Sequence, residues 1–337
     1  MLNGTLTREP GGSVAREWLI KSDDKAHGYG KDPYKRTIQE LLETGVINLD
    51  KPPGPTSHEV VSWVKGILHI KRAGHSGTLD PHVTGGLPTM LGDATRLVRV
   101  LLLSGKEYVC VMRLHADVPE GQVRRVMEEF TGVIYQRPPL VSAVKRQVRK
   151  RTIYYINFLE KSDRDVLFIV GCEAGTYIRK LCHDIGEALG CGAHMYELRR
   201  TKSGPFREDE SLITLHTLKD TYEIWKETGN EGPLRKCIYP MEYALRDLPA
   251  IVVKDSAVDA LARGARLGVQ GISRLQSGIR PGDTVAVFTH LGEAVSLGKA
   301  LMSSEEMLKA AEGQAIDTLA VAMKPGVYPS GWKNKAQ

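Results

Sequence analysis

Hydrophobic positions recur at helical spacing in some segments of the chain and alternate with polar positions in others. The helical spacing predicts amphipathic helices over residues 57–69, 94–103, 123–130 and 176–189. Alternation predicts strands over 108–114 and 166–172, and the apolar run 46–49 predicts a buried strand that the proline-rich segment 50–55 ends. Because these elements follow one another without a regular βαβ repeat, the pattern favours an α+β fold with a mixed, mainly antiparallel sheet.

The pattern changes on both sides of this region. Residues 1–44 are polar and Gly-rich, so we expect an extended arm that ends in a short helix over 37–44. Near residue 250 a second unit begins, with a helix over 256–263 and strands over 284–289 and 294–301. These boundaries divide the chain into an arm 1–44, a domain 45–249, a small β-rich domain 250–327 and a frayed tail 328–337.

Basic residues exceed acidic ones, 46 against 40, and the excess is concentrated in one segment. Between Phe130 and Leu159 the chain has no Asp or Glu but has six basic residues: Arg137, Lys145, Arg146, Arg149, Lys150 and Arg151. A charge run is often only a solvated face, but a one-sign cluster of this density is typical of a surface that binds a polyanion. The sequence therefore favours nucleic acid as a partner.

The rest of the composition excludes several other classes of protein. The five cysteines include no Cys-x-x-Cys pair and the ten histidines no His-x-x-x-His pair, so neither a disulfide framework nor a metal site is indicated. No apolar run is long enough to span a bilayer, and the N-terminus lacks a signal-peptide pattern. We therefore expect a soluble, intracellular protein with no metal and no membrane partner.

One acidic residue stands in an unusual setting. Asp80 lies in the segment GHSGTLDP (74–81), where two glycines let the backbone approach a bulky ligand and a proline fixes the chain after the carboxylate. Taken alone, Leu-Asp-Pro is typical of an ordinary turn. Tyr108 at the start of a predicted strand, and Tyr177 and Arg179 before a predicted helix, could join Asp80 in one site. Taken singly, the tyrosines would be core aromatics and the arginine a surface residue.

Seven short segments, in the same order along the chain, resemble the motifs of one enzyme family. They are GVINLDKPPGPTS (45–57), GHSGTLDP (74–81), ATRLV (94–98), GKEYV (105–109), QRPPL (136–140), GTYIR (175–179) and ELRR (197–200). Together they resemble the TruB/dyskerin family of pseudouridine synthases, and most closely the archaeal catalytic proteins of box H/ACA RNA-guided particles. Residues 250–327 resemble the PUA domain of that family. The resemblance implies a pseudouridine-synthase catalytic domain followed by a PUA RNA-binding domain, on which the N-terminal arm is expected to pack.

The resemblance also implies roles for the candidate site residues. Asp80 matches the catalytic aspartate, and Arg179 matches its basic partner, which would favour the ionised carboxylate. Tyr108 matches the aromatic residue that stacks on the target base, and Tyr177 matches a tyrosine near the uracil edge. We expect these four residues to form the active site.

A second group of residues is expected to bind RNA. Lys51 and His75 match motif positions that shape or flank the RNA-binding cleft. The basic stretch from Lys145 to Arg151 would be a mobile thumb that clamps the RNA backbone. Its members are Lys145, Arg146, Arg149, Lys150 and Arg151.

The reaction and partners follow from the same resemblance. Isomerising uridine to pseudouridine in rRNA, and also in tRNA, breaks the glycosidic bond, turns the base and rejoins it through C5, so it needs neither a cofactor nor a metal. The target base must be flipped out of folded RNA and held by stacking. The expected partners are a box H/ACA guide RNA, the substrate RNA and small companion proteins. Without the Lys-rich tails of eukaryotic dyskerins, the chain is expected to be archaeal and cytoplasmic; a nucleolar protein would require a eukaryotic source.

Two positions depart from the family pattern, and two other functions stay open. His82 stands where Lys is usual and Gly86 where a bulky apolar residue is usual, so we expect looser packing there. The first alternative is a stand-alone tRNA pseudouridine synthase, which would act on naked tRNA. The second is a non-catalytic RNA-binding scaffold, which would need none of the four active-site residues.

Overall fold

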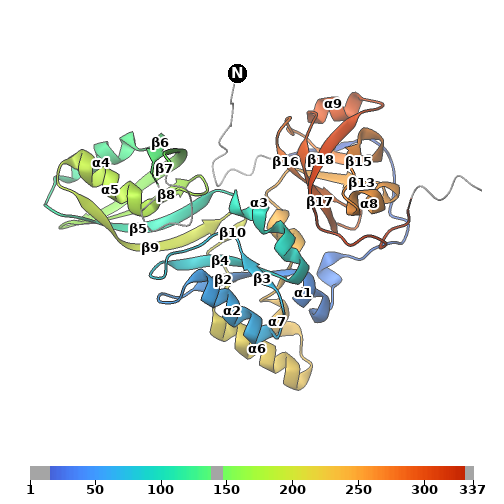
Figure 1. The fold of residues 1–337 in the computed structure, drawn as a ribbon, viewed down its shortest axis with the longest axis horizontal. Helices are drawn as coiled ribbons and strands as arrows, with labels where there is room; N and C mark the ends of the chain where they lie inside the picture. The colour runs from blue at the N-terminus through green and yellow to red at the C-terminus, as the bar shows by residue number, and fades with distance from the viewer. Residues whose placement is uncertain (1–15, 138–146, 331–337) are drawn as a thin grey trace, which may run out of the picture.

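The computed structural model describes residues 16–137 and 147–330, which form two β-sheets with helices packed against them (Figure 1). The larger sheet fills the left and centre of the view, and the smaller one lies at the upper right. Most neighbouring strands run antiparallel, so the expected α+β class with a mixed, mainly antiparallel sheet is confirmed. In this described part of the chain, no helix is long and apolar enough to cross a membrane.

The larger sheet has 11 strands, eight of them on one continuous path. From edge to edge that path is β11 (Leu212–Ile213), β2 (Gly45–Lys51), β4 (Thr84–Leu91), β9 (Ala193–Ser203), β5 (Lys106–Leu114), β8 (Asp165–Cys172), β7 (Arg149–Ser162) and β6 (Gly132–Gln136). Short strands β3 (Ala73–His75), β10 (Phe206–Arg207) and β12 (Tyr239–Pro240) pair with β4, β9 and β2. The parallel pairs on this path are β11 with β2 and β4 with β9. The predicted strands over 46–49, 108–114 and 166–172 are therefore confirmed.

Two groups of helices cover this sheet (Figure 1). Helices α4 (Glu120–Glu129) and α5 (Ile178–Leu189) share one apolar cluster with β5 and β8. Helices α1 (Ile38–Thr44), α2 (Ser57–Leu68), α6 (Leu215–Thr228) and α7 (Gly232–Arg235) share another with β2 and β4. Thr56 and Glu59 form a capping box at the start of α2, and α5 ends at Gly190 with φ +76°, so both predicted helices are confirmed.

The sequence pattern missed several strands and simplified one helix. In β4, the glycines and Pro88 disguise a strand. In β9, buried positions are taken by charged residues such as Arg200 and Lys202, so the alternation of apolar and polar residues is lost. The segment predicted as one helix over 94–103 begins as a 3₁₀ turn (Gly92–Leu97) before α3 (Val98–Leu102).

The smaller sheet has seven strands and includes part of the N-terminal arm. Its order is β1 (Trp18–Ile20), β15 (Ile272–Gln276), β13 (Ala250–Val253), β16 (Thr284–Phe288), β17 (Ala294–Ala300), β18 (Gln314–Val321) and β14 (Leu267–Gly268). Helices α8 (Asp255–Ala262) and α9 (Ser304–Lys309) pack on its core. The predicted helix over 256–263 and the hairpin of strands over 284–289 and 294–301 are confirmed. Because β1 pairs with β15, residues 18–20 of the arm contribute a strand to this sheet.

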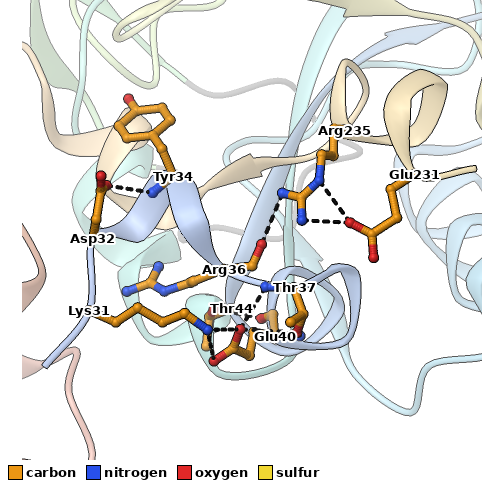
Figure 2. Close-up of polar contacts among 9 residues, drawn as sticks. All are labelled: Lys31, Asp32, Tyr34, Arg36, Thr37, Glu40, Thr44, Glu231 and Arg235. Carbon is orange, nitrogen blue, oxygen red and sulfur yellow. Dashed lines mark hydrogen bonds and ion pairs between the residues drawn. The ribbon is translucent and has the colours of Figure 1, made fainter.

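The arm then runs to α1 through a series of polar contacts (Figure 2). Thr37 caps α1 in a capping box with Glu40, whose carboxylate also accepts two bonds from Lys31 Nζ at 3.0 and 2.7 Å. The carbonyl of Arg36 accepts a bond from Arg235 Nη1 at 2.9 Å. These contacts cap α1 and fix the arm against α7. The short helix expected over 37–44 is therefore confirmed.

An ion pair and an apolar cluster join the two sheets. The Arg36 guanidinium donates to both carboxylate oxygens of Glu242 at 2.7 and 2.8 Å, and the Ala294 amide of β17 donates to the same carboxylate at 3.0 Å. A shared apolar cluster includes Val46 of β2 and Leu297 of β17. We call the Arg36–Glu242 pair with the Ala294 amide the junction.

The predicted fraying of the tail from residue 328 is wrong for its first residue. Tyr328 is buried, and its hydroxyl donates to Glu293 Oε2 at 2.8 Å. An aromatic ring that completes an apolar core outweighs the polar composition around it. Residues 331–337 of the expected tail lie outside the described residues.

Candidate active site

Asp80 lies in the loop between β3 and β4, and hydrogen bonds fix the backbone on both sides of it. The hydroxyl of Ser57, at the start of α2, accepts from the Leu79 amide at 2.9 Å and donates to the Leu79 carbonyl at 3.1 Å. The Val83 amide donates to the Asp80 carbonyl at 3.0 Å. The Asp80 side chain itself is 49% exposed. The backbone is therefore held rigidly while the carboxylate stays accessible to a ligand.

Lys51 binds the backbone of the same loop through its ammonium group. Its side chain is fully buried, and its ammonium donates to the carbonyls of Pro52, Pro81 and Val83 at 2.9, 2.8 and 2.9 Å. Burial lowers the pKa of Lys51, and the charge of Asp80 opposes that shift. All three ammonium protons are thus used inside the protein, and a contact of Lys51 with RNA stays a prediction. Lys51 shapes the loop.

Arg179 pairs with Asp80, as the resemblance implied. Its Nη2 lies 3.0 Å from Asp80 Oδ2, and the arginine side chain is 52% exposed. Because both partners are about half exposed, the pair adds little stability, on the order of 0 to 1 kcal/mol. An incoming ligand can therefore replace water or the guanidinium at this carboxylate at small cost.

Tyr177 stands at the N-cap of α5, two residues before Arg179. The side chain of Gln136, at the end of β6, donates to the Tyr177 carbonyl at 3.1 Å and accepts from its amide at 2.9 Å. This paired contact orients the first turn of α5, which carries the arginine. Sequence reasoning quoted Gln136 only as part of a motif, although a polar residue at a strand end could have indicated such a clamp.

Tyr108 lies in β5, opposite Arg200 of β9 and Val170 of β8. Burial raises the pKa of the Tyr108 hydroxyl, and a hydrogen bond and the positive charge of Arg200 partly oppose that shift. The phenol is therefore neutral near neutral pH. The structure brings this ring, Asp80, Tyr177 and Arg179 around the ends of β5, β9 and α5.

Arg200 is the residue that sequence reasoning missed most clearly. It is 1% exposed, and its guanidinium donates to the carbonyls of Gly86 at 2.7 Å and Gly77 at 3.2 Å. One side chain thus connects β4, β5, β9 and the loop that carries Asp80. Because the alternation of apolar and polar residues is lost in β9, the only available signal was that Arg200 ends the quoted segment ELRR (197–200).

His75 is the last residue of β3, directly before this loop, and does not present a charge to solvent. Its Nδ1 accepts from the Gly77 amide at 3.3 Å, and its ring packs edge-on against His58 at 5.1 Å between centroids. Burial, followed by the charges of His58 and Arg200, lowers the pKa of His75 to about 4. A neutral imidazole forms no ion pair with a phosphate, and the role of His75 in shaping or flanking the RNA-binding cleft stays a prediction.

The basic stretch is only partly within the described residues, since Lys145 and Arg146 lie outside them. Arg149 and Lys150 begin β7, and Lys150 Nζ lies 5.7 Å from the centroid of the exposed Tyr135 ring. Arg151 turns inward, with 19% of its side chain exposed and its Nη1 3.7 Å from Glu173 Oε1. Arg151 is therefore a poorer candidate for a phosphate contact than the sequence indicated.

The two departures from the family pattern have small structural effects. His82 is exposed, and a Cβ added at Gly86 would meet its nearest atom, Asn48 Oδ1, at an ordinary 3.6 Å. The neighbouring Gly85 is the constrained position, with φ +99° and room for no Cβ because the Arg200 carbonyl would lie 2.3 Å away. The looser packing that we expected is therefore limited to position 86, where there is room for a Cβ.

The chain matches the parts of one family in sequence. Residues 65–178 match the TruB family pseudouridylate synthase (N terminal domain), and residues 179–246 match the tRNA pseudouridylate synthase B C-terminal domain. Residues 249–322 match the PUA domain, and residues 15–61 match the DKCLD (NUC011) domain. These matches cover both sheets and the arm.

Whole-chain relatives agree with these matches. The chain is 59% identical over 307 residues to the "Probable tRNA pseudouridine synthase B" of Methanosarcina barkeri, covering 91% of this chain and 90% of the relative. It is 57% identical to a chain in the crystal structure of a Cbf5-Nop10-Gar1 complex, with TM-score 0.90 and coverage of 94% and 97%. A chain in an H/ACA RNP bound to a substrate RNA containing 2′-deoxyuridine has 55% identity, TM-score 0.88 and coverage of 95% and 98%. The chain therefore belongs to the TruB family of pseudouridine synthases.

Proposed function

We propose that this chain isomerises uridine to pseudouridine in RNA, with Asp80 as the catalytic carboxylate. The observation that carries the proposal is the accessible Asp80–Arg179 pair, set on a rigid loop beside the Tyr108 ring. A single carboxylate that acts at the sugar is sufficient for this isomerisation. Tyr108 stacks on the flipped base, and Tyr177 lies near the edge of the uracil.

The chain works as the catalytic subunit of a guide-RNA-dependent particle. The similarity to chains in the Cbf5-Nop10-Gar1 complex and the substrate-bound H/ACA RNP supports this, because it spans nearly the full length of both chains. The partners are a box H/ACA guide RNA, a substrate rRNA or tRNA and small companion proteins. We place the protein in the cytoplasm of an archaeal cell.

The division of labour follows the two sheets. Residues 45–249 form the catalytic domain and residues 250–327 the PUA domain that anchors RNA; of the arm, residues 18–20 pair with the PUA sheet, whereas α1 (38–44) packs on the catalytic core and corrects the expectation that the arm packs on the PUA domain alone. The pairing of β1 with β15 and the PUA match over residues 249–322 support this division.

A stand-alone enzyme that modifies tRNA without a guide is the second candidate. The name of the archaeal relatives, "Probable tRNA pseudouridine synthase B", favours it. The two candidates share one chemistry and differ only in how the RNA is brought to Asp80.

The deciding experiment measures tritium release from uridine labelled at C5, because forming the new C1′–C5 bond displaces that hydrogen. One reaction contains the protein with tRNA alone, and the other contains the protein with guide RNA, its substrate RNA and companion proteins. Release only in the second reaction supports the guided enzyme, and release from tRNA alone supports the stand-alone enzyme. No release in either reaction contradicts the proposed function.

A further inference from the structure

Two buried cations, Arg200 and Lys106, lie in the protein interior next to the proposed site, and neither contacts a carboxylate. Arg200 donates to the carbonyls of Gly77 and Gly86, and Lys106 Nζ donates to those of Leu101, Leu102 and Ser104 at 2.9, 3.0 and 2.6 Å. Both are at least 95% buried, with 1% and 5% of their surfaces exposed. Among the ion pairs within the described ranges, none includes either residue.

This arrangement leaves net positive charge in a low-dielectric region. Carbonyl dipoles satisfy the hydrogen-bonding needs of a cation but do not neutralise it, and burying an unneutralised charge is expensive. Burial lowers the pKa of Arg200, yet a guanidinium keeps its proton at any physiological pH. Burial, with the charge of Arg200 second, lowers the pKa of Lys106 to about 7. Arg200 is therefore the permanent charge of the pair.

Both cations converge on the loop that carries Asp80. A Cβ added at Gly77, three residues before Asp80, would lie 3.6 Å from Arg200 Nη1 and 3.9 Å from Lys106 Cε. Arg200 also lies opposite Tyr108 in the β5–β9 pair, and its positive charge lowers the pKa of the Tyr108 hydroxyl against the effect of burial. The positive charge therefore sits behind the ring on which the target base would stack.

The proposed reaction develops negative charge at that place. When the C1′–N1 bond breaks, its electron pair stays with the base, and the detached uracil carries one negative charge spread over N1 and its carbonyl oxygens. C1′ is satisfied either by a new bond to an Asp80 oxygen or by the electron pair of the C2′–H bond, with Asp80 taking that proton. In both routes the base is an anion until C5 bonds to C1′, which either breaks the C1′–O bond to Asp80 or is accompanied by return of the proton from Asp80 to C2′. C5 then loses its hydrogen as a proton and N1 takes up a proton, which gives neutral pseudouridine and the free Asp80 carboxylate.

We propose that Arg200, supported by Lys106, stabilises the anionic uracil that the isomerisation passes through. The inference rests on the proposed function. Arg200 is buried opposite Tyr108, and it acts by its charge, as preorganised dipoles and charges do in other active sites. Burying Arg200 without a carboxylate partner costs folding free energy, and this role explains why the cost is tolerated.

The test compares two bases that differ in how readily they leave as anions. Fluorine at C5 withdraws electrons and makes the detached base a weaker base, so 5-fluorouridine needs less stabilisation than uridine. Single-turnover loss of the target nucleoside is measured by chromatography of digested RNA, with the assembled complex. Arg200→Met should slow uridine conversion by about 10²-fold, in line with removing one charge-stabilising group. The loss with 5-fluorouridine should be at least tenfold smaller, and Arg200→Lys should lie between.

Lys202→Met is the matched control. Lys202 is a second buried cation of β9, but carboxylates lie near it. The charges of Asp247 and Glu107 oppose the lowering of its pKa by burial. Its replacement should change the rates for the two bases by the same factor. If Arg200→Met also slows both bases equally, its role is structural and the proposal is overturned.

A second variant covers the case in which Arg200→Met does not fold, as judged by thermal unfolding and guide-RNA binding. Lys106→Met should then show a smaller loss with the same dependence on the base, and an equal loss for both bases overturns the proposal. A wild-type complex that leaves uridine unchanged contradicts the proposed function itself, which separates the two failures.

Discussion

Buried charges are treated in opposite ways in two regions of this molecule. At the junction, Arg36 and Glu242 are 12% and 6% exposed and neutralise each other through two hydrogen bonds. Behind Asp80, Arg200 and Lys106 are equally buried but bind only neutral partners. A neutralised pair holds two parts of a fold together, whereas an unneutralised cation is useful only where an anion forms. The comparison separates charges used for assembly from charges used for chemistry.

The largest effect is expected at the carboxylate that faces the unneutralised charges. Asp80→Asn keeps the shape of the side chain and removes its charge, so isomerisation should fall by on the order of 10⁴-fold or more. RNA affinity and the midpoint of thermal unfolding should change little, because the Asp80–Arg179 pair is half exposed. A variant that keeps more than a tenth of the wild-type rate would make Asp80 an ordinary turn residue.

The junction should respond in the reverse way. Glu242→Gln leaves the buried Arg36 guanidinium without its counter-charge, so the free energy of unfolding should drop by about 3 to 5 kcal/mol. The single-turnover rate at a temperature where the variant is folded should stay near wild type.

Glu40→Gln is the control for that variant. Its partner Lys31 and Glu40 are each 43% exposed, and glutamine can still complete the capping box with Thr37 (Figure 2). The unfolding free energy should change by less than about 1 kcal/mol. Equal losses for Glu242→Gln and Glu40→Gln would remove the distinction between the junction and an exposed ion pair.

The Tyr108 ring tests whether the region in front of Arg200 receives a base. Tyr108→Ala should weaken binding of the flipped base by about 1 to 3 kcal/mol, the usual worth of one stacking contact. Tyr108→Phe keeps the ring and loses only the hydroxyl, so its effect on the single-turnover rate should be smaller. If both variants lose the same activity, the ring does not stack.

The sequence predicted the helices and strands whose buried side chains are mainly apolar. It missed the strands and contacts that depend on buried polar groups. Helices α2 and α5 were predictable because apolar periodicity and end signals agree. Strand β9 was not, because Arg200 occupies a core position that the apolar pattern reserves for a hydrophobic residue. The Asp80–Arg179 pair followed from a family resemblance. The clamps by Ser57, Gln136 and Lys51 did not, since they depend on which carbonyls and amides the folded chain brings within reach.

The smallest effect is expected at the start of β7, where Lys150 is exposed and Arg149 is partly exposed to solvent. Replacing both Arg149 and Lys150 by glutamine should weaken substrate RNA binding regardless of sequence, because phosphate contacts release counterions without reading bases. Each true phosphate contact that is lost should lower the slope of log affinity against log salt by about 0.7 to 0.9. Arg151→Gln is the control, since its guanidinium faces Glu173 and should leave the slope unchanged. Salt titrations of the three proteins measure this, and parallel lines for the double variant and wild type would show that the exposed charges of β7 contact no RNA.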